Sequence, residues 1–292
     1  MLTVNAYGKI NLALDILGKR DDGYHEVAMI MQTIDLADTL YFSEQSAGIS
    51  VSSDEQELAC DQTNLAYRAA SLLQERFFVK QGVHIELKKR IPLAAGLAGG
   101  SADAAGTLIG LNHRWQLGMT VEQLADLGAV LGADVPFCVR GGTMLATGRG
   151  EKLSRLPLLP SCWAILAKPR IQVSTVWAYQ HYRAGAVEKH PDIPAMLACL
   201  ERGDLKGITA GLCNVLESVT IPVHPEIGEL KRQLQELGVR GCLMSGSGPT
   251  VFGLTPDCCR AKAVAEKLKK QSDAVILVSK VGGANGTSIA AD

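Results

Sequence analysis

The stretch PLAAGLAGGSADAA, residues 92–105, decides how this chain folds. An alternating apolar and polar run at 83–88 precedes it and predicts a strand, and the residues after it predict a helix. Gly96, Gly99 and Gly100 leave room for backbone N–H groups to approach an anion, and a helix start adds partial positive charge. Ser101 is a suitable N-cap, with Asp103 in the first helical turn. The segment therefore predicts a loop that holds phosphate groups.

This loop differs from two common phosphate-binding signatures. The sequence contains no GxxxxGK[ST], and the spacing of the three glycines does not follow GxGxxG. A helix-capping glycine loop without any ligand is the alternative interpretation. The preceding Pro92, the long run of small residues and the helix that follows favour the phosphate-binding interpretation.

The remaining pattern predicts strands and helices in an α+β order. Residues 9–16 alternate as a half-buried strand, with Lys9 and Asn11 side by side on its non-core face. We expect further strands or extended segments at 137–139, 143–146, 163–168, 239–244, 251–254 and 274–281, and helices starting near 63, 101, 121 and 257. The proline-rich segment 156–160 predicts a boundary between a domain at 1–155 and a second domain at 156–292.

Composition excludes several classes of protein. The 292 residues are 47% hydrophobic and 20% charged with a net charge of −1, the balance of an ordinary globular protein. The longest basic block is 88–90, which predicts no nucleic-acid partner. No apolar run approaches the roughly 18–20 residues of a membrane span, and the first residues lack the pattern of a signal peptide. The eight cysteines have no zinc-ligand spacing. We therefore expect a cytoplasmic protein with no membrane partner and no protein-ligated metal site.

The phosphate loop resembles that of the GHMP kinase superfamily, which includes galactokinase, homoserine kinase and mevalonate kinase. AYGKINLALDILGKRDDGYHEV at 6–27, LGADVPFCVRGGTMLATGRGE at 131–151 and SGSGPTVFGL at 245–254 are similar to the branch that phosphorylates a cytidine diphosphate-linked methylerythritol. The resemblance covers the whole chain and is weakest over 181–220. It implies a ribosomal-protein-S5-like N-terminal domain and a ferredoxin-like C-terminal domain. Ala98 departs from the family pattern, which often has glycine there; a methyl group is tolerated at this residue if its φ stays negative.

The resemblance implies two catalytic residues, Lys9 and Asp134. Asp134 would accept the proton of the substrate hydroxyl, and Lys9 would keep that carboxylate ionised. Considered alone, a loop aspartate before Val135-Pro136 is usually a turn former, and a strand lysine is usually a solvated charge. Their joint match to the family motifs favours the catalytic interpretation. Whether Asp134 is a base or only orients the hydroxyl stays open.

The resemblance also implies the ligands and their contacts. ATP would be bound by Asn64, Lys89, Pro92, Leu93, Ala94, Ala95, Gly96, Leu97, Ala98, Gly99, Gly100, Ser101 and Ala102. The acceptor would be bound by Asn11, Tyr24, His25, Thr175 and Tyr179. Mg²⁺ is expected on the β- and γ-phosphates, with Ser101 as the nearest hydroxyl.

Several alternatives stay open at this point. The alternative interpretation of Asn64 is a helix cap only, and that of Lys89 is a surface charge. The turn at 245–250 is expected to support the phosphate loop. The chain is expected to be a monomer or a weak homodimer. Two other functions remain: a GHMP kinase of the homoserine or mevalonate type, and an inactive nucleotide-binding sensor.

Overall fold

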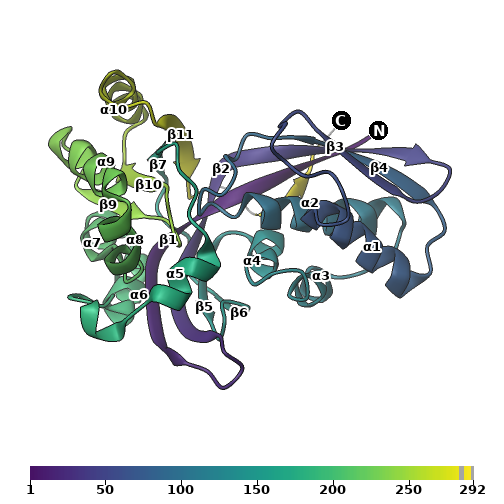
Figure 1. The fold of residues 1–292 in the computed structure, drawn as a ribbon, viewed down its shortest axis with the longest axis horizontal. Helices are drawn as coiled ribbons and strands as arrows, with labels where there is room; N and C mark the ends of the chain where they lie inside the picture. The colour runs from purple at the N-terminus through teal and green to yellow at the C-terminus, as the bar shows by residue number, and fades with distance from the viewer. Residues whose placement is uncertain (283–285, 291–292) are drawn as a thin grey trace.

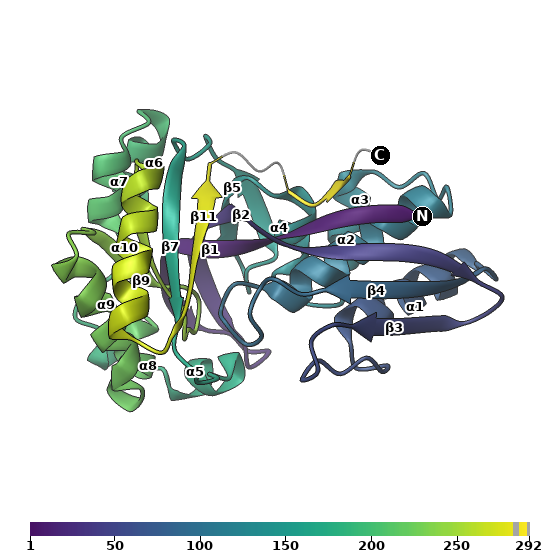
Figure 2. The same ribbon diagram turned by 90° about the horizontal axis from the view of Figure 1, so that it is seen from above.

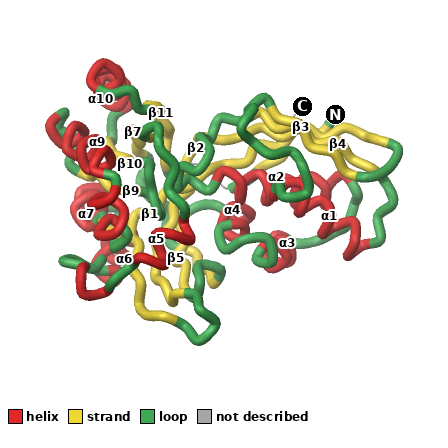
Figure 3. The backbone as a smooth tube through the Cα atoms, in the orientation of Figure 1, coloured by secondary structure: helices red, strands yellow, loops and turns green. Residues whose placement is uncertain are grey.

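A computed structural model describes residues 1–282 and 286–290 of the chain. Two halves, each with strands and helices packed on them, make up the molecule, and their strands join in one sheet. The long strands β1 (Leu2–Lys19) and β2 (His25–Gln45) run from one half into the other (Figure 1). Both halves contain helices as well as strands (Figure 3). This mixed α+β fold confirms the predicted class.

The first half is an antiparallel hairpin extended by further strands. β4 (Gly82–Lys88) pairs with the outer part of β2, and β3 (Ile49–Ser53) lies parallel to β4. β5 (Thr143–Thr147) pairs with the other part of β2, followed by β6 (Lys152–Arg155). The helices are α1 (Leu65–Phe77), α2 (Gly99–Arg114), α3 (Val121–Gly128) and α4 (Val135–Arg140).

α2 lies unusually close to the strands because two of its glycines face them. A Cβ at Gly110 would lie 2.7 Å from the ring of Phe42, and one at Gly106 would lie 3.1 Å from Leu40. Interiors pack at crystal-like density, so a side chain at these positions would displace Leu40 or Phe42. This close contact holds α2 against the strands, and its N-terminal end lines the cleft.

The second half is an antiparallel sheet covered by helices. Its strands run in the order β11 (Val275–Val281), β7 (Cys162–Lys168), β10 (Val251–Thr255) and β9 (Gly241–Met244). Figure 2 shows the helices lying along the outer face of this sheet. They are α6 (Ile193–Glu201), α7 (Leu205–Gly211), α8 (Glu217–Val223), α9 (Pro225–Glu236) and α10 (Cys258–Gln271). α5 (Thr175–His181) lies between the halves and is followed by the 3₁₀ turn η1 (Ala184–Ala186).

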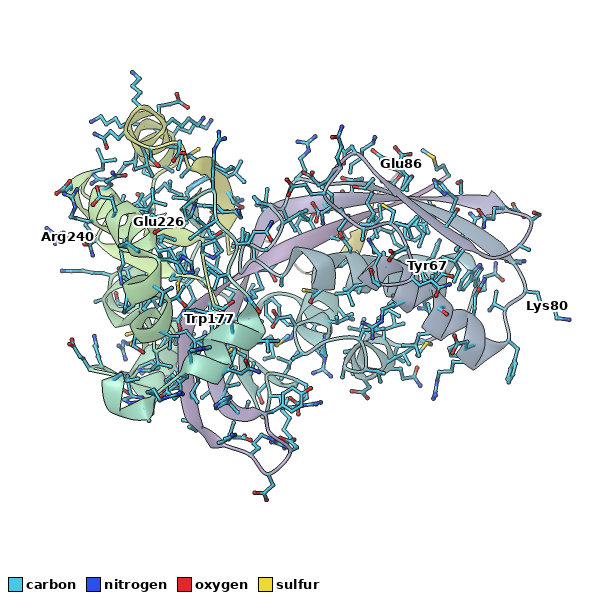
Figure 4. The ribbon with its side chains drawn as sticks, viewed as in Figure 1. Tyr67, Lys80, Glu86, Trp177, Glu226 and Arg240 are labelled. Carbon is cyan, nitrogen blue, oxygen red and sulfur yellow. The ribbon has the colours of Figure 1, made fainter. Side chains whose placement is uncertain are left out.

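Strand contacts join the halves in the part of the chain that the structure describes. β11 pairs with β2 through Val281 and Ile34, and β8 (Cys213–Asn214) runs parallel to β1. β12 (Ser288–Ile289) returns to the first half and pairs with β1. Figure 4 places Lys80 and Arg240 at opposite ends of the molecule, with Trp177 of α5 between them. The boundary at 155/156 stays a prediction.

Several local expectations were wrong. Residues 137–139 are not extended: they belong to the helix α4, which Asp134 precedes at the N-cap position. Proline suits the first turn of a helix, and Pro136 occupies it. α2 begins at Gly99 and not at Ser101, and its N-cap is Ala98. Ala98 has a φ of +60°, not a negative value.

Candidate active site

A cleft of about 870 Å³ lies between the halves. It is lined by most of the residues that the sequence singled out: Lys9, Asn11, Tyr24, His25, Lys89, Pro92, Leu93, Ala94, Ala95, Gly96, Ala98, Gly99, Gly100, Ser101, Asp134, Thr175 and Tyr179. Residues from both ends of the chain therefore meet around one cavity large enough for two small ligands.

The phosphate loop ends at an uncapped helix. Ala98, at the N-cap of α2, has no side chain that could accept the first N–H groups, so those groups remain available to an anion. Ser101 is the third residue of α2, and its side chain lines the cleft instead of capping the helix. The backbone of this loop has the chemistry that phosphate binding requires.

Gly96 is the point where the loop meets the second glycine-rich turn. Its φ is +72°, and a Cβ there would lie 2.9 Å from Gly248 O. The carbonyl oxygen of Gly96 accepts a hydrogen bond from Ser245 Oγ at 3.0 Å and one from Lys9 Nζ at 3.1 Å. The turn at 245–250 therefore supports the loop directly.

A break in strand register places Lys9. The β1–β2 pairing is irregular between Tyr7 and Lys9 and resumes with Lys9 opposite Thr33, and the Lys9 N–H donates to Leu97 O of the loop at 3.0 Å. The Lys9 side chain is 5% exposed and donates to Asn11 Oδ1 at 2.8 Å. Its Nζ lies 3.7 Å from Asp134 Oδ2. A buried ammonium is thus surrounded by three oxygen acceptors, which offset the cost of removing it from water.

Asp134 lines the cleft, and its carboxylate accepts no capping hydrogen bond from its own helix. Although it stands at the N-cap of α4, it makes no side-chain cap hydrogen bond. Its side chain is 32% exposed, and the nearby ammonium of Lys9 is its ion-pair partner. A carboxylate so placed can accept a hydrogen bond or a proton from a hydroxyl that enters the cleft.

Lys89 belongs to a buried ion-pair cluster below the loop. Its Nζ donates to Asp38 Oδ2 and, at 2.6 Å, to Asp103 Oδ2. Burial raises the pKa of Asp103 to about 7; the ammonium of Lys89 opposes this rise and the carboxylate of Asp38 adds to it. Asp38 Oδ1 also accepts the N–H groups of Arg90 and Ile91. The cluster fixes the entry to the loop, and Lys89 is not a surface charge.

Asp103 was expected in the first turn of α2 as a partner of the helix dipole. It is instead fully buried and paired with Lys89. Asp38 was missed because a single aspartate in a strand carries no motif. No sequence spacing connects these three residues.

Three predicted ATP contacts do not line the cleft. Asn64 caps α1: its Oδ1 accepts from Ala66 N at 2.9 Å and its Nδ2 donates to Ala59 O at 2.7 Å. Leu97 is 1% exposed and Ala102 is fully buried. The geometry of Asn64 is that of a helix cap.

Aromatic rings gather at the other end of the cleft. The His25 ring lies 5.6 Å from Tyr179 and 6.2 Å from Tyr182, between centroids. Burial and the charge of Lys19 lower the pKa of His25, so its ring is neutral at pH 7 and offers one donor and one acceptor. Burial also raises the pKa of Tyr179, which keeps its hydroxyl protonated. Together these tilted and edge-on rings form an aromatic slot with polar atoms at its edge.

Two further features frame this slot. Tyr24 is 57% exposed, and the guanidinium of Arg149 lies 5.1 Å from the centroid of its ring. Thr175 Oγ1 lies 3.0 Å from Ser247 Oγ, which links α5 to the second glycine-rich turn. Arg149 lines the cleft and was missed, although it lies in the quoted GRGE segment.

In the described part of the chain no helix is long and apolar enough to cross a membrane.

The chain matches two family models and several known kinases. The model of the GHMP kinases N terminal domain matches residues 64–142, and that of the GHMP kinases C terminal matches 196–274. The chain is 52% identical over 282 residues to the 4-diphosphocytidyl-2-C-methyl-D-erythritol kinases of Bacillus cytotoxicus and Bacillus cereus, covering 96% of this chain and 97% of each relative.

Solved structures agree with this match. A crystal structure of 4-(cytidine 5'-diphospho)-2C-methyl-D-erythritol kinase superposes with a TM-score of 0.83 at 35% identity, covering 97% of this chain and all of that one. A homoserine kinase from Cytophaga hutchinsonii superposes with a TM-score of 0.79 at 20% identity over 99% of this chain and 97% of that one, which shows a shared fold. The chain belongs to the 4-diphosphocytidyl-2-C-methyl-D-erythritol kinase family of the GHMP kinases, and it is an ATP-dependent kinase.

Proposed function

We propose that this chain transfers the γ-phosphoryl group of ATP to the 2-hydroxyl of 4-diphosphocytidyl-2-C-methyl-D-erythritol, a step in isoprenoid precursor synthesis. One arrangement carries the proposal: the Lys9–Asp134 pair lies in the same cleft as the phosphate loop and the His25–Tyr179 slot. A nucleotide triphosphate, a reacting hydroxyl and a nucleobase each have matching chemistry along this cleft.

The protein's contribution to the transfer is mainly position and charge. Phosphoryl transfer passes through a loose transition state that needs little covalent help. The uncapped start of α2 would hold the β- and γ-phosphates, and Asp134 would orient the acceptor hydroxyl and take its proton as the new bond forms. Lys9 would keep Asp134 ionised and stabilise the negative charge that develops on the transferred group.

Magnesium fits the residues beside the loop. Mg²⁺ keeps most of its ligands as phosphate oxygens and water, so one or two protein oxygens suffice. The hydroxyl of Ser101 lines the cleft and would be the nearest protein oxygen to the ion. Within residues 1–282 and 286–290, no three His, Cys, Asp or Glu side chains group as a dedicated metal site. When bound, the ion neutralises charge on the β- and γ-phosphates.

The aromatic slot would select the cytosine of the acceptor. The neutral His25 ring can match the donor and acceptor pattern of a cytosine edge. Tyr179 offers a face for stacking, worth about 1–3 kcal/mol for a base on an aromatic ring. A monomer or weak homodimer in the cytoplasm remains part of the proposal.

An acceptor panel tests this assignment. Purified protein is assayed for ATP-dependent phosphorylation of 4-diphosphocytidyl-2-C-methyl-D-erythritol, homoserine and mevalonate. We expect turnover with the cytidine substrate and at most trace turnover with the others. Turnover only with an acceptor that lacks cytidine contradicts the assignment, and binding of ATP without any turnover favours a sensor.

A further inference from the structure

Asn214 belongs to none of the sequence motifs, yet both the nitrogen and the oxygen of its side-chain amide make hydrogen bonds. The residue is 4% exposed and forms half of the short strand β8. Its Nδ2 donates to Met244 O at 2.8 Å and to Gly246 O at 2.7 Å, and its Oδ1 accepts from Leu216 N at 3.0 Å. The buried Asn214 amide nitrogen therefore donates hydrogen bonds to two backbone carbonyls at the start of the glycine-rich turn.

The two carbonyls that Asn214 binds flank Ser245. The hydroxyl of Ser245 donates to Gly96 O, the same oxygen that accepts from the ammonium of Lys9. A Cβ placed on Gly246 would lie only 3.3 Å from Lys9 Nζ. The backbone that Asn214 fixes is thus in contact with both the phosphate loop and the catalytic lysine.

The anchor and the lysine also share a strand. β8 pairs in parallel with β1 at Leu14, and the Val215 N–H donates to Leu14 O at 3.0 Å. Asn214 therefore connects the strand that carries Lys9 with the turn that lies beside it.

The chemistry of the position requires an amide. Two carbonyl oxygens need two donors, and a carboxylate of the same shape would face both with negative charge. The neighbouring backbone N–H of Met244 is bound by a carboxylate, Glu217, at 3.0 Å. Donor and acceptor side chains are thus matched to the polarity of the turn.

We propose that Asn214 is a positioning residue for phosphoryl transfer: it holds the turn at 244–248 against Gly96 and thereby fixes Lys9. This inference rests on the proposed function for its assay. A displacement of about 1 Å in a reacting group costs on the order of a hundredfold in rate, so loss of this anchor appears chiefly in kcat.

The test compares Asn214→Asp with Asn112→Asp. Asn112 is a matched control because its amide also binds a backbone N–H and C=O, those of Met119, outside the cleft. At pH 8 we expect Asn214→Asp to lower kcat about 10–100-fold with less than about a threefold change in the KM of the acceptor. Asn112→Asp should keep the wild-type kcat per folded molecule. Thermal unfolding measures the stability of both variants.

The dependence of kcat on pH is a second measurement, and a residue with a merely structural role does not change it. As pH falls, the new carboxyl becomes protonated and donates one hydrogen bond again, so the kcat of Asn214→Asp recovers toward that of the wild type. If Asn214→Asp fails to fold, a double-mutant cycle of Asn214→Ser with Ser245→Ala replaces it, and non-additive losses in kcat are expected because both act on one turn.

Two results overturn the proposal: a kcat per folded molecule within about twofold of the wild type, or additive losses in the cycle. Wild-type turnover is measured first on each acceptor. Absent wild-type turnover refutes the acceptor assignment alone, and the Asn214 comparison is then made on acceptor-independent ATP hydrolysis.

Discussion

Lys9 Nζ lies 3.7 Å from Asp134 Oδ2, although one residue comes from the first strand and the other precedes α4. The lysine is also bound to Asn11 and to the carbonyl of Gly96 in the phosphate loop. A single buried ammonium therefore links the proposed base to the loop that would hold ATP. The relative placement of base and phosphates is built into the fold before any ligand arrives.

The aromatic slot gives a prediction about the acceptor alone. Tyr179→Leu removes the stacking face beside His25 while keeping apolar volume. We expect the KM of the acceptor to rise about 5–150-fold, the equivalent of roughly 1–3 kcal/mol, with the KM of ATP unchanged. Steady-state kinetics with each substrate varied in turn checks this. Tyr67→Leu, on α1 and away from the slot (Figure 4), is the control and should change neither constant. An equal rise in both KM values after Tyr179→Leu would count against a role in acceptor binding.

The left-handed backbone at Ala98 predicts a stabilising substitution. The left-handed conformation destabilises a non-glycine residue such as Ala98 by about 1–2 kcal/mol. Ordering a glycine instead costs about 0.5–1 kcal/mol in backbone conformational entropy. Ala98→Gly should therefore raise the free energy of unfolding by about 0.5–1 kcal/mol, measured in urea. Ala102→Gly, inside the right-handed part of α2, should lower it by about 1 kcal/mol. If both variants lose stability equally, Ala98 does not have a left-handed backbone.

The buried cluster predicts how stability depends on pH. Asp103 has a pKa of about 7 in the folded protein against 3.8 for the ordinary side chain. Its contribution to folding is fully present below about pH 4 and is lost as the pH rises through 7, because the native state binds the proton more tightly. The free energy of unfolding of Asp103→Asn, relative to the wild type, should therefore increase between pH 5 and 8.

Urea unfolding at the two pH values measures this change, which is about 2–3 kcal/mol because only the roughly two pH units between pH 5 and the pKa of about 7 contribute. Asp126→Asn, at an exposed position on α3, should show the same small difference from the wild type at both pH values. A pH-independent difference for Asp103→Asn would show that Asp103 is already ionised at pH 5.

Local patterns predicted the fold class and much of the site. The alternation around Lys9, the glycines of the loop and the aromatic residues of the slot are all local signals, and the structure brings them to one cleft. The roles proposed for these residues stay predictions. The α4 helix was misread because Val135-Pro136 was taken to favour extended backbone, whereas Asp134 before a proline in the first turn is also a helix-start signal.

Long-range polar contacts could not be predicted in this way. Asp38 meets Lys89 and Asp103 only after β2, β4 and α2 have packed together. The sequence gives no signal for Asn214 either, because its hydrogen-bond partners lie about thirty residues further along the chain, in another strand and turn. Such residues carry no spacing rule, because tertiary packing alone decides which polar groups must be satisfied.

Replacement of Asp134 by asparagine tests the central claim most directly. The amide keeps the shape of the side chain and its place beside Lys9 but removes the charge and the capacity to accept a proton. We predict that Asp134→Asn lowers kcat for phosphorylation of 4-diphosphocytidyl-2-C-methyl-D-erythritol at least about a hundredfold, with normal folding and ATP binding, while Asp126→Asn keeps wild-type turnover. Near-wild-type kcat in a folded Asp134→Asn enzyme would contradict the account.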